Sequence, residues 1–288
     1  METKQLNGKA IYSPKGKAGE YAKYACNFYV GCSNDCDYCY CKRGVLGHAM
    51  GKPQATLKKC FKDESHALQV FEKELRANLA ELQKHGLFFT FTSDPMIEEC
   101  ISLTIRAIDY AHINKVPCMI LTKRGDFIQK LPIFWLYQND NSLSHRYLAF
   151  GFTLTGHDEL ERGASTNAGR IECMRNLHNA GFKTFASIEP IIDLASSFDM
   201  IKQTLDCCDL YKIGLLSGKR NYTREEVAVF LQSVNNMIWC DTMQKTKGNA
   251  VKLYWKDSVL EYIGIDRTHF MVNYPHCVPA DYNMFNNK

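Results

Sequence analysis

Residues 27–41 read Asn27-Phe28-Tyr29-Val30-Gly31-Cys32-Ser33-Asn34-Asp35-Cys36-Asp37-Tyr38-Cys39-Tyr40-Cys41. Three cysteines of this stretch, Cys32, Cys36 and Cys39, are separated by three and then by two intervening residues. Thiolates are soft ligands that hold zinc or iron–sulfur clusters. A structural zinc site needs four ligands, usually in two close pairs well separated along the chain, and no second pair of that kind follows. The spacing therefore favours a four-iron cluster held by three thiolates, with one iron left open.

The composition bounds the size and class of the protein. The chain has 288 residues, of which 45% are hydrophobic and 23% are charged. These fractions are ordinary for a soluble globular protein, and the length fits one large domain or one domain with an appendage. The formal net charge of +4 is too small to indicate a nucleic-acid partner by itself.

The cysteine content indicates the compartment. The chain has thirteen cysteines, an odd number, and its first residues lack the apolar run of a secretory leader. Both features argue against a secreted disulfide scaffold. No later run is long enough to span a bilayer. We therefore expect a cytoplasmic protein without a membrane partner, because a reducing compartment suits an oxygen-sensitive cluster.

Hydrophobic periodicity predicts strands that alternate with helices. Apolar residues recur every three or four positions after Asp63, which predicts a helix that ends near Gly86. The predicted strands are 24–30, 87–92, 116–122, 147–155, 183–188, 210–216 and, in addition, 251–255. Helices are predicted between them, one of them over 127–137. This alternation is typical of βαβ units and a parallel sheet, so we expect an α/β fold.

The cysteine spacing, with an aromatic residue just before the third cysteine, resembles the signature of radical S-adenosylmethionine (radical SAM) enzymes. The resemblance implies a partial (β/α)6 TIM-like barrel with a C-terminal extension. It also implies one [4Fe-4S] cluster on Cys32, Cys36 and Cys39, with S-adenosylmethionine on the open iron. Reductive cleavage of that cofactor yields a 5′-deoxyadenosyl radical that abstracts hydrogen from a substrate, in a lyase or an oxidoreductase type of reaction. We expect a polar arm over residues 1–23, the barrel over 24–218 and the extension over 219–288.

Four further segments narrow the resemblance to the spore photoproduct lyase-like branch and its uncharacterised relatives. They are Tyr12-Ser13-Pro14-Lys15-Gly16-Lys17-Ala18, Thr92-Ser93-Asp94-Pro95, Leu121-Thr122-Lys123 and Phe185-Ala186-Ser187-Ile188-Glu189-Pro190-Ile191-Ile192. The similarity covers residues 10–215, and the last 70 residues carry none, so lyase activity does not follow from it.

Polar side chains stand at the predicted carboxyl ends of the strands, where such barrels gather their chemistry. They are Thr92, Ser93, Asp94, Lys123, Thr153, Thr155, Ser187, Glu189 and Ser217. We expect Lys123 to pair with the carboxylate of S-adenosylmethionine, Asp94 to accept from its amino group and Glu189 to accept from a ribose hydroxyl. The resemblance implies the same role for Lys123, places Thr92 to Asp94 in the segment that binds the amino group and sets Tyr38 beside the adenine. Each polar residue alone is also explained as a helix cap, and no catalytic residue is predicted.

The substrate stays open at this level. A basic cluster surrounds the cysteine loop, with tyrosines available for stacking: Lys15, Lys17, Lys42, Arg43, Lys52, Lys58, Lys59, Tyr21, Tyr24, Tyr38 and Tyr40. This cluster suits a nucleic acid but is more simply explained as a solvated surface, and a peptide or a small molecule is an alternative. We expect an electron donor of the reductase and flavodoxin type, or a ferredoxin.

Two other classes of protein compete with the enzyme hypothesis. An iron–sulfur sensor or electron carrier would need no site for S-adenosylmethionine. A zinc-binding module would need a fourth ligand near the loop, which only Cys41 or His48 could supply. Cys41 is more simply a bystander, and Cys240 and Cys277 are either inert thiols or hydrogen donors to a substrate radical.

Overall fold

The computed structural model describes residues 4–44, 47–136, 143–244 and 250–285. Eight strands form one sheet in the order β1-β2-β5-β6-β7-β8-β9-β10. All neighbours from β2 to β10 are parallel, and β1 pairs antiparallel with β2 at the edge. The strands are β1 Ile11–Tyr12, β2 Ala25–Cys26, β5 Leu87–Phe89, β6 Cys118–Thr122, β7 Leu148–Thr153, β8 Lys183–Ile191, β9 Leu210–Leu215 and β10 Lys252–Trp255.

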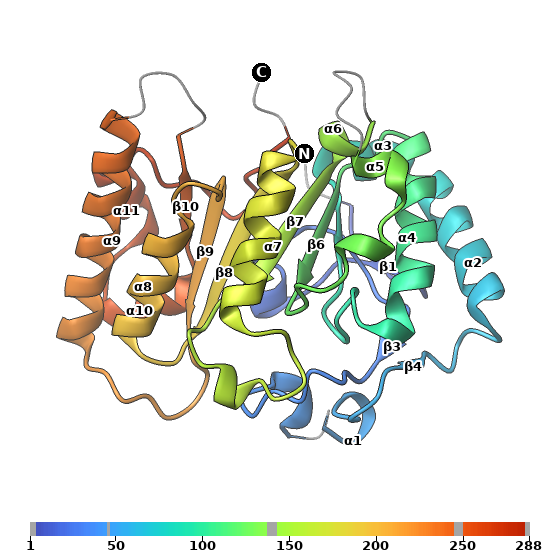
Figure 1. Ribbon diagram of the computed structural model, residues 1–288, viewed down its shortest axis with the longest axis horizontal. Coiled ribbons are helices and arrows are strands. Elements are labelled where there is room, and N and C mark those ends of the chain that lie inside the picture. Colours follow the sequence, from blue (N-terminus) through green and yellow to red (C-terminus); the bar gives the residue numbers. More distant parts are fainter. Residues whose placement is uncertain (1–3, 45–46, 137–142, 245–249, 286–288) are drawn as a thin grey trace.

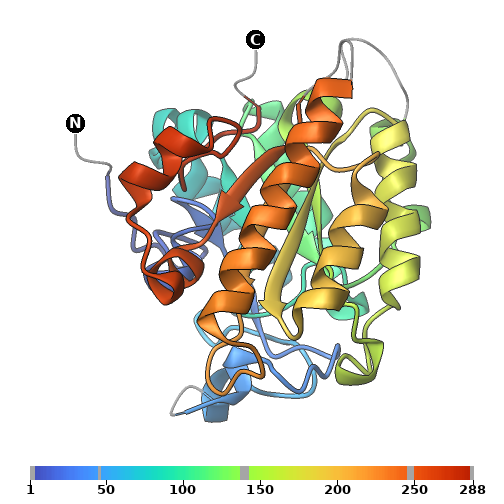
Figure 2. The same cartoon turned by 90° about the vertical axis from the view of Figure 1, so that its left-hand side faces the viewer.

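Helices cover the outer face of the curved sheet (Figure 1, Figure 2). The longer ones are α2 Glu64–Ala77, α4 Glu98–Ile113, α7 Asn167–Asn179, α8 Leu194–Thr204 and α9 Arg224–Gln244. The shorter ones are α1 Gly47–Met50, α3 Leu79–His85, α5 Ile133–Leu136, α6 Leu143–Tyr147, α10 Asp257–Ile263 and α11 Arg267–Asn273. This mixed α/β architecture confirms the predicted fold class, with β10 as a seventh parallel strand. None of the helices in the described ranges is both long and apolar enough to cross a bilayer.

Three predicted elements are divided. The strand over 24–30 is broken at Asn27 into β2 and β3 Tyr29–Val30, because the Asn27 side chain bonds Tyr12 and the amide of Phe91. β3 pairs with β4 Thr56–Leu57 in a separate small sheet. The helix after Asp63 is two helices that meet at Asn78. The described part of 127–137 is a 3-10 turn over Ile128–Lys130 and the short α5, since Pro132 lies between them.

The predicted arm and the predicted extension both contribute to the sheet. Strand β1 belongs to residues 1–23, and strand β10 belongs to residues 219–288. Lys212 on β9 contacts both regions from inside the barrel. Its Nζ donates to the carbonyls of Glu20 at 3.1 Å and Tyr21 at 2.8 Å in the arm, and it lies 5.5 Å from the centre of the Tyr254 ring in the extension. Burial and the nearby charge of Lys256 lower the pKa of Lys212 to about 7. The domain boundaries themselves stay a prediction.

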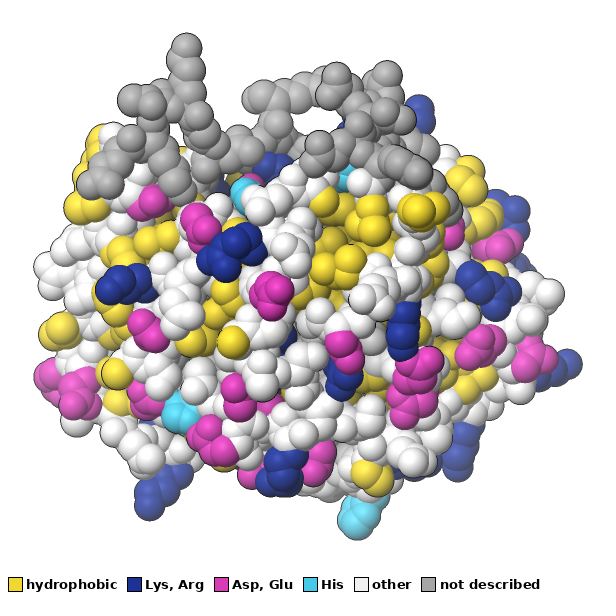
Figure 3. Space-filling model, viewed as in Figure 1, with side chains coloured by type: hydrophobic (Ala, Val, Ile, Leu, Met, Phe, Trp, Pro, Cys, Tyr) yellow, Lys and Arg dark blue, Asp and Glu magenta, His cyan; other side chains and the backbone are white. Residues whose placement is uncertain are grey.

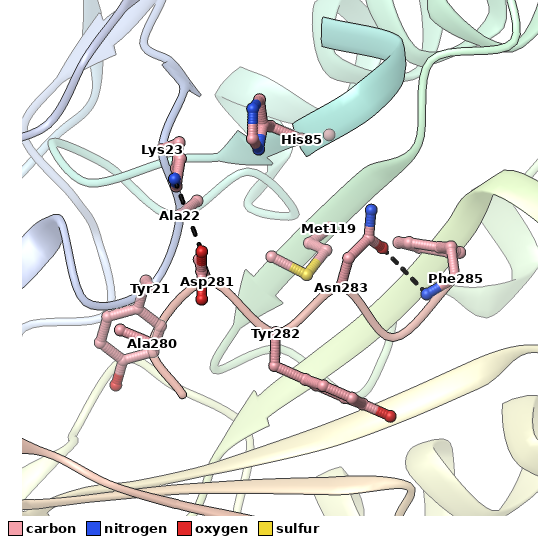
Figure 4. A pocket seen from close by; sticks show the side chains of 11 residues that line it. Tyr21, Ala22, Lys23, His85, Met119, Ala280, Asp281, Tyr282, Asn283 and Phe285 are labelled. Carbon is pink, nitrogen blue, oxygen red and sulfur yellow. Dashed lines mark hydrogen bonds and ion pairs between the residues drawn. The ribbon is translucent and has the colours of Figure 1, made fainter. Parts of the chain in front are cut away.

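The barrel interior is apolar and is closed at the amino ends of its strands. Inward-facing side chains such as Phe88, Phe185 and Tyr254 pack with Val278 and Met284 of the C-terminal tail. Figure 4 shows the tail crossing this end, where Asp281 lies 3.6 Å from Lys23. The pocket left there has a volume of about 20 Å³, which is room for about one water molecule. The described residues therefore leave no room at this end for a ligand much larger than a water molecule.

Candidate functional site

A cavity of about 470 Å³ opens at the carboxyl ends of the strands. Its wall brings together every residue predicted to contact the cluster or S-adenosylmethionine: Cys32, Cys36, Cys39, Tyr38, Thr92, Ser93, Asp94, Lys123, Thr153 and Glu189. These residues come from the cysteine loop and from the ends of four strands of the parallel sheet. The structure thus places the predicted set in one site, and the contact predicted for each residue stays a prediction.

Backbone contacts with distant segments shape the start of the cysteine loop. The amide of Gly31 donates to the Thr92 carbonyl at 3.1 Å, and the amide of Cys32 donates to the Lys52 carbonyl at 3.0 Å. Gly31 has a φ of +89°, and a Cβ there would lie 2.3 Å from the Gln54 carbonyl oxygen. Only glycine fits such a position without strain. The loop is therefore held at its entry by two separate parts of the chain, the segment at Lys52 and the segment at Thr92.

The thiols of the loop differ in their acidity. Burial raises the pKa of Cys32 to about 12 and also raises that of Cys36. A hydrogen bond from Cys41 lowers the pKa of Cys39 to about 6. Because the thiolate is the ligand form, the bond from Cys41 favours the form of Cys39 that binds a metal.

The candidate donor set consists of three thiols on one loop, Cys32, Cys36 and Cys39. No group of three or more His, Cys, Asp or Glu side chains in the described ranges is gathered as ligands of one metal ion. A structural zinc holds four ligands around one point, whereas a four-iron cluster binds each thiolate through a different iron. Of the two candidates for a fourth zinc ligand, Cys41 lines the cavity and His48, on α1, is absent from its lining. Neither Cys240 nor Cys277 belongs to the lining that the described residues form.

Asn34, between the first two cysteines, carries an unpartnered acceptor. Its Nδ2 donates to Asp94 Oδ2 at 2.7 Å, but its Oδ1 is buried and accepts no hydrogen bond among the described residues. Buried polar atoms are rarely left unpaired, and an exception calls for an explanation such as an absent ligand. Asn34 therefore fits a site that takes a ligand with N–H or O–H donors.

Asp94 joins the cysteine loop to the end of β6. Besides Asn34, its carboxylate accepts from Thr122 Oγ1 at 2.7 Å and from the backbone amides of Lys123 and Met96 at 2.7 and 2.9 Å. These donors occupy both carboxylate oxygens. Asp94 thus holds the neighbouring groups of the site in place, in addition to the contact with an amino group that the sequence predicts.

Lys123 is a cation of the cavity wall that no described carboxylate holds in an ion pair. Its Nζ lies 5.5 Å from the centre of the Tyr38 ring, and within the described part of the chain it makes no ion pair. Burial opposes its charge, but Cys36 and Glu161 outweigh that effect and raise the pKa of Lys123. A permanently charged ammonium next to the cysteine loop suits a carboxylate-bearing ligand.

The remaining predicted polar residues are held by neighbours. Thr92 Oγ1 donates to the Tyr29 carbonyl at 2.6 Å, and Ser93 Oγ lies 3.4 Å from Cys100 Sγ. The carbonyl of Thr153 accepts from Arg170 at 2.6 Å. The Thr92 side chain thus holds the backbone at Tyr29, and the Thr153 backbone holds the side chain of Arg170.

Glu189 is paired with two residues whose contact with it the sequence did not predict. Its carboxylate accepts from Tyr21 Oη at 2.7 Å and from Lys256 Nζ at 2.9 and 3.1 Å. Tyr21 also lies 2.6 Å from Ser187 Oγ. Tyr21 belongs to the predicted polar arm and Lys256 to the extension, and no local motif signals either. A ribose hydroxyl at Glu189 would join this existing set of contacts.

The mouth of the cavity is basic. Seven lysines and arginines line the cavity, against three carboxylates: Lys15, Lys17, Lys42, Arg43, Lys52, Lys123 and Lys256 against Asp35, Asp94 and Glu189. Tyr21, Tyr38 and Tyr40 of the predicted stacking residues also line it, whereas Lys58, Lys59 and Tyr24 belong to other surfaces or to the core. Figure 3 shows lysine and arginine side chains along the lower edge of the molecule, the edge at which α1 lies in Figure 1.

Comparisons with known proteins agree with this fold. No family model matches the chain. An uncharacterized protein of Methanocaldococcus jannaschii is 25% identical over 235 residues, which cover 76% of this chain and 79% of that protein.

Solved structures of other proteins share the fold of this chain. The particular similarity is to spore photoproduct lyase. A cysteine-to-serine mutant of that enzyme is 18% identical with a TM-score of 0.55, covering 74% of this chain and 60% of the lyase chain. Its complex with dinucleoside spore photoproduct is 19% identical with a TM-score of 0.52, covering 73% and 60%. A double mutant with bound AdoMet and dinucleoside spore photoproduct is 18% identical with a TM-score of 0.51, again covering 73% and 60%.

This chain therefore spans about 60% of the length of the lyase chains that it matches. At these identities the similarity shows the fold alone. The resemblance predicted from the sequence is confirmed at that level.

Proposed function

We propose that this protein is a radical SAM enzyme. The observation that carries the proposal is the single cavity that holds the three cysteines of the signature, the unpaired Lys123 ammonium and the unpartnered acceptor of Asn34. Cys32, Cys36 and Cys39 would hold a [4Fe-4S] cluster, and S-adenosylmethionine would lie beside it. Together they supply a one-electron cleavage of the sulfonium that generates a radical able to abstract hydrogen from a C–H bond.

The chain's own residues bind and orient the cofactor. Lys123 holds a carboxylate by charge, and Asn34 Oδ1 accepts from a neighbouring ammonium. Asp94 keeps Asn34 and the Lys123 backbone at a fixed separation, because its carboxylate bonds both. The Tyr38 ring lies next to Lys123 and offers a face to an adenine.

The basic mouth favours an anionic substrate, and we propose a nucleic acid. Lys15, Lys17, Arg43 and Lys52 make no ion pair with a described carboxylate, so their charges are available to phosphates. Exposed Tyr40 lies among them as a surface for base stacking. An electron donor of the flavodoxin or ferredoxin type and a cytoplasmic location complete the proposal.

The test is reconstitution of the protein with iron and sulfide without oxygen, reduction by dithionite and addition of S-adenosylmethionine. We expect 5′-deoxyadenosine by chromatography, and none from Cys36→Ala. A cluster that forms without ever cleaving the cofactor would support a sensor or an electron carrier instead. Zinc bound in place of iron would contradict both hypotheses.

A further inference from the structure

A short segment after β7 forms the back of the cysteine loop. We call residues 160–163 the cradle. The amide of Asp37 donates to the Leu160 carbonyl at 2.9 Å, and the amide of Gly163 donates to the Asn34 carbonyl at 3.0 Å. Between these bonds, Cys36 and Glu161 form an isolated antiparallel bridge. The cradle thus pairs with the loop as one more strand would.

Glu161 links the cradle to the loop through its side chain as well. It is buried, and its carboxylate accepts from the hydroxyl of Tyr38, from Arg170 Nη2 and, at 3.3 Å, from Thr155 Oγ1. Tyr38 stands between the second and third cysteines of the signature. Glu161 therefore pairs with Cys36 through its backbone and binds Tyr38 through its carboxylate.

Arg170 anchors this carboxylate to the barrel. It lies on α7 with no exposed surface, and its Nε and Nη1 donate to the carbonyls of Ser165 at 2.8 Å and Thr153 at 2.6 Å. Its remaining donor group holds Glu161 in an ion pair that is inaccessible to solvent on both sides. The end of β7, the start of α7 and the cysteine loop thus converge on one buried pair.

A buried ion pair is poorly explained as a stability device. Desolvation of two charges offsets most of their attraction, and apolar residues of similar volume often stabilise a protein as well or better. Such a pair does fix a geometry, because either charge alone is strongly unfavourable in the interior. Its position behind the signature cysteines indicates what geometry it fixes.

We propose that Glu161 and Arg170 are positioning residues that set the conformation of the cysteine loop before any metal arrives. A loop that is already ordered loses less conformational entropy when it takes up its cluster. The identity of the group that the loop receives depends on the function proposed above, but the ordering of the metal-free loop does not.

The decisive variant replaces both charges, as Glu161→Leu with Arg170→Met, and thus leaves no unpaired charge in the core. Hydrogen exchange is measured on the metal-free protein at the amides of Asp37 and Gly163, which donate across the cradle. We expect a melting temperature close to that of the wild type and exchange at these two amides about tenfold faster. Iron and sulfide uptake, followed by absorbance, should slow by about tenfold in the same variant.

Two further variants keep the result decisive. Arg175→Gln removes an exposed charge from the same helix, α7, where it pairs with Asp206 and not with the cysteine loop, and it should change neither measurement. Gly163→Ala keeps the ion pair but places a Cβ 2.0 Å from the Ser33 carbonyl oxygen, so it should displace the loop and speed exchange even if the double variant fails to fold.

Wild-type exchange at Asp37 and Gly163 in the folded double variant would overturn the proposal. If the wild-type protein binds no iron–sulfur cluster, only the function proposed above fails, since the exchange experiment contains no metal.

Discussion

Lys256 Nζ lies 2.9 Å from Glu189 Oε2 and 3.1 Å from Glu189 Oε1, which joins the C-terminal extension to the wall of the cavity. The same ammonium donates to the Lys17 carbonyl at 2.9 Å. Gly214 on β9 leaves the space that this contact needs, because a Cβ there would lie 2.8 Å from the Glu189 carboxylate. Three regions distant in sequence thus meet at one ion pair on the cavity wall.

Lys256→Met should destabilise the fold by about 3 kcal/mol, since it leaves the Glu189 carboxylate without its cation in a largely buried position. The Lys256 side chain is 1% exposed and that of Glu189 is 17% exposed. Urea unfolding measures the change. Lys252→Met, at the start of the strand β10 that precedes Lys256, is the matched control, and an equal loss in both variants would contradict the assigned role of the pair.

Asp94→Asn should cost about 2–3 kcal/mol of stability and weaken the binding of S-adenosylmethionine. Each carboxylate oxygen accepts from one side chain and one backbone amide, so the new NH₂ group must face an N–H donor whichever way it turns. Urea unfolding and calorimetric titration with the cofactor measure the two effects. Ser93→Ala loses only a contact with Cys100 and should change stability by less than about 0.5 kcal/mol. Unchanged stability of Asp94→Asn would refute the network described above.

Lys17→Ala combined with Arg43→Ala should weaken binding of a single-stranded oligonucleotide and reduce the slope of log affinity against log salt by about 1–2. The two side chains meet at Ser217, where Lys17 Nζ bonds its hydroxyl and Arg43 Nη1 bonds its carbonyl, both at 2.8 Å. Fluorescence anisotropy over a salt series measures the slope. Lys59→Ala lies outside the cavity lining and serves as the control; an equal change there would indicate general charge attraction in place of a defined mouth.

His157 should make stability depend on pH. Burial lowers its pKa, but Glu159, 2.7 Å from Nδ1, and Asp193, bonded to Nε2, outweigh burial and raise it. Its contribution is therefore fully present below the unfolded value near 6.5 and is lost as the pH rises through the higher folded value. The lowered pKa values of Asp193 and Glu159 act only on the acid side of this range.

The measurement for His157 is the urea midpoint between about pH 6 and pH 9. The wild type should lose more stability over this interval than His157→Asn, which cannot titrate. Parallel curves for the two proteins would show that the pair of carboxylates does not hold a charged histidine.

Several features of the site could be predicted because they are local in the sequence. The spacing of Cys32, Cys36 and Cys39 sets their placement on one loop, and the alternation of apolar and polar residues sets the order of strands and helices. Parallel strands end at one edge of a sheet, so the sequence alone could assign Asp94, Lys123 and Glu189 to one mouth of the barrel.

Other features have no local signal. Asn27 lies inside an apolar run that predicts one strand, and only its bonds to Tyr12 and Phe91 show why the strand breaks there. Glu161 and Arg170 stand in polar segments that resemble solvated loops and helix surfaces, yet both are buried.

The sequence by itself determined the class of the fold and predicted Cys32, Cys36 and Cys39 as cluster ligands, because both depend on short-range spacing. Only the tertiary structure decided what holds those ligands: Glu161 behind Cys36, Asp94 beside Asn34, and Lys256 against Glu189. A charged side chain is stable in the interior only beside a partner of opposite charge or a set of hydrogen bonds. Those partners lie tens to hundreds of residues away along this chain, so the fold alone reveals which charges are buried and paired.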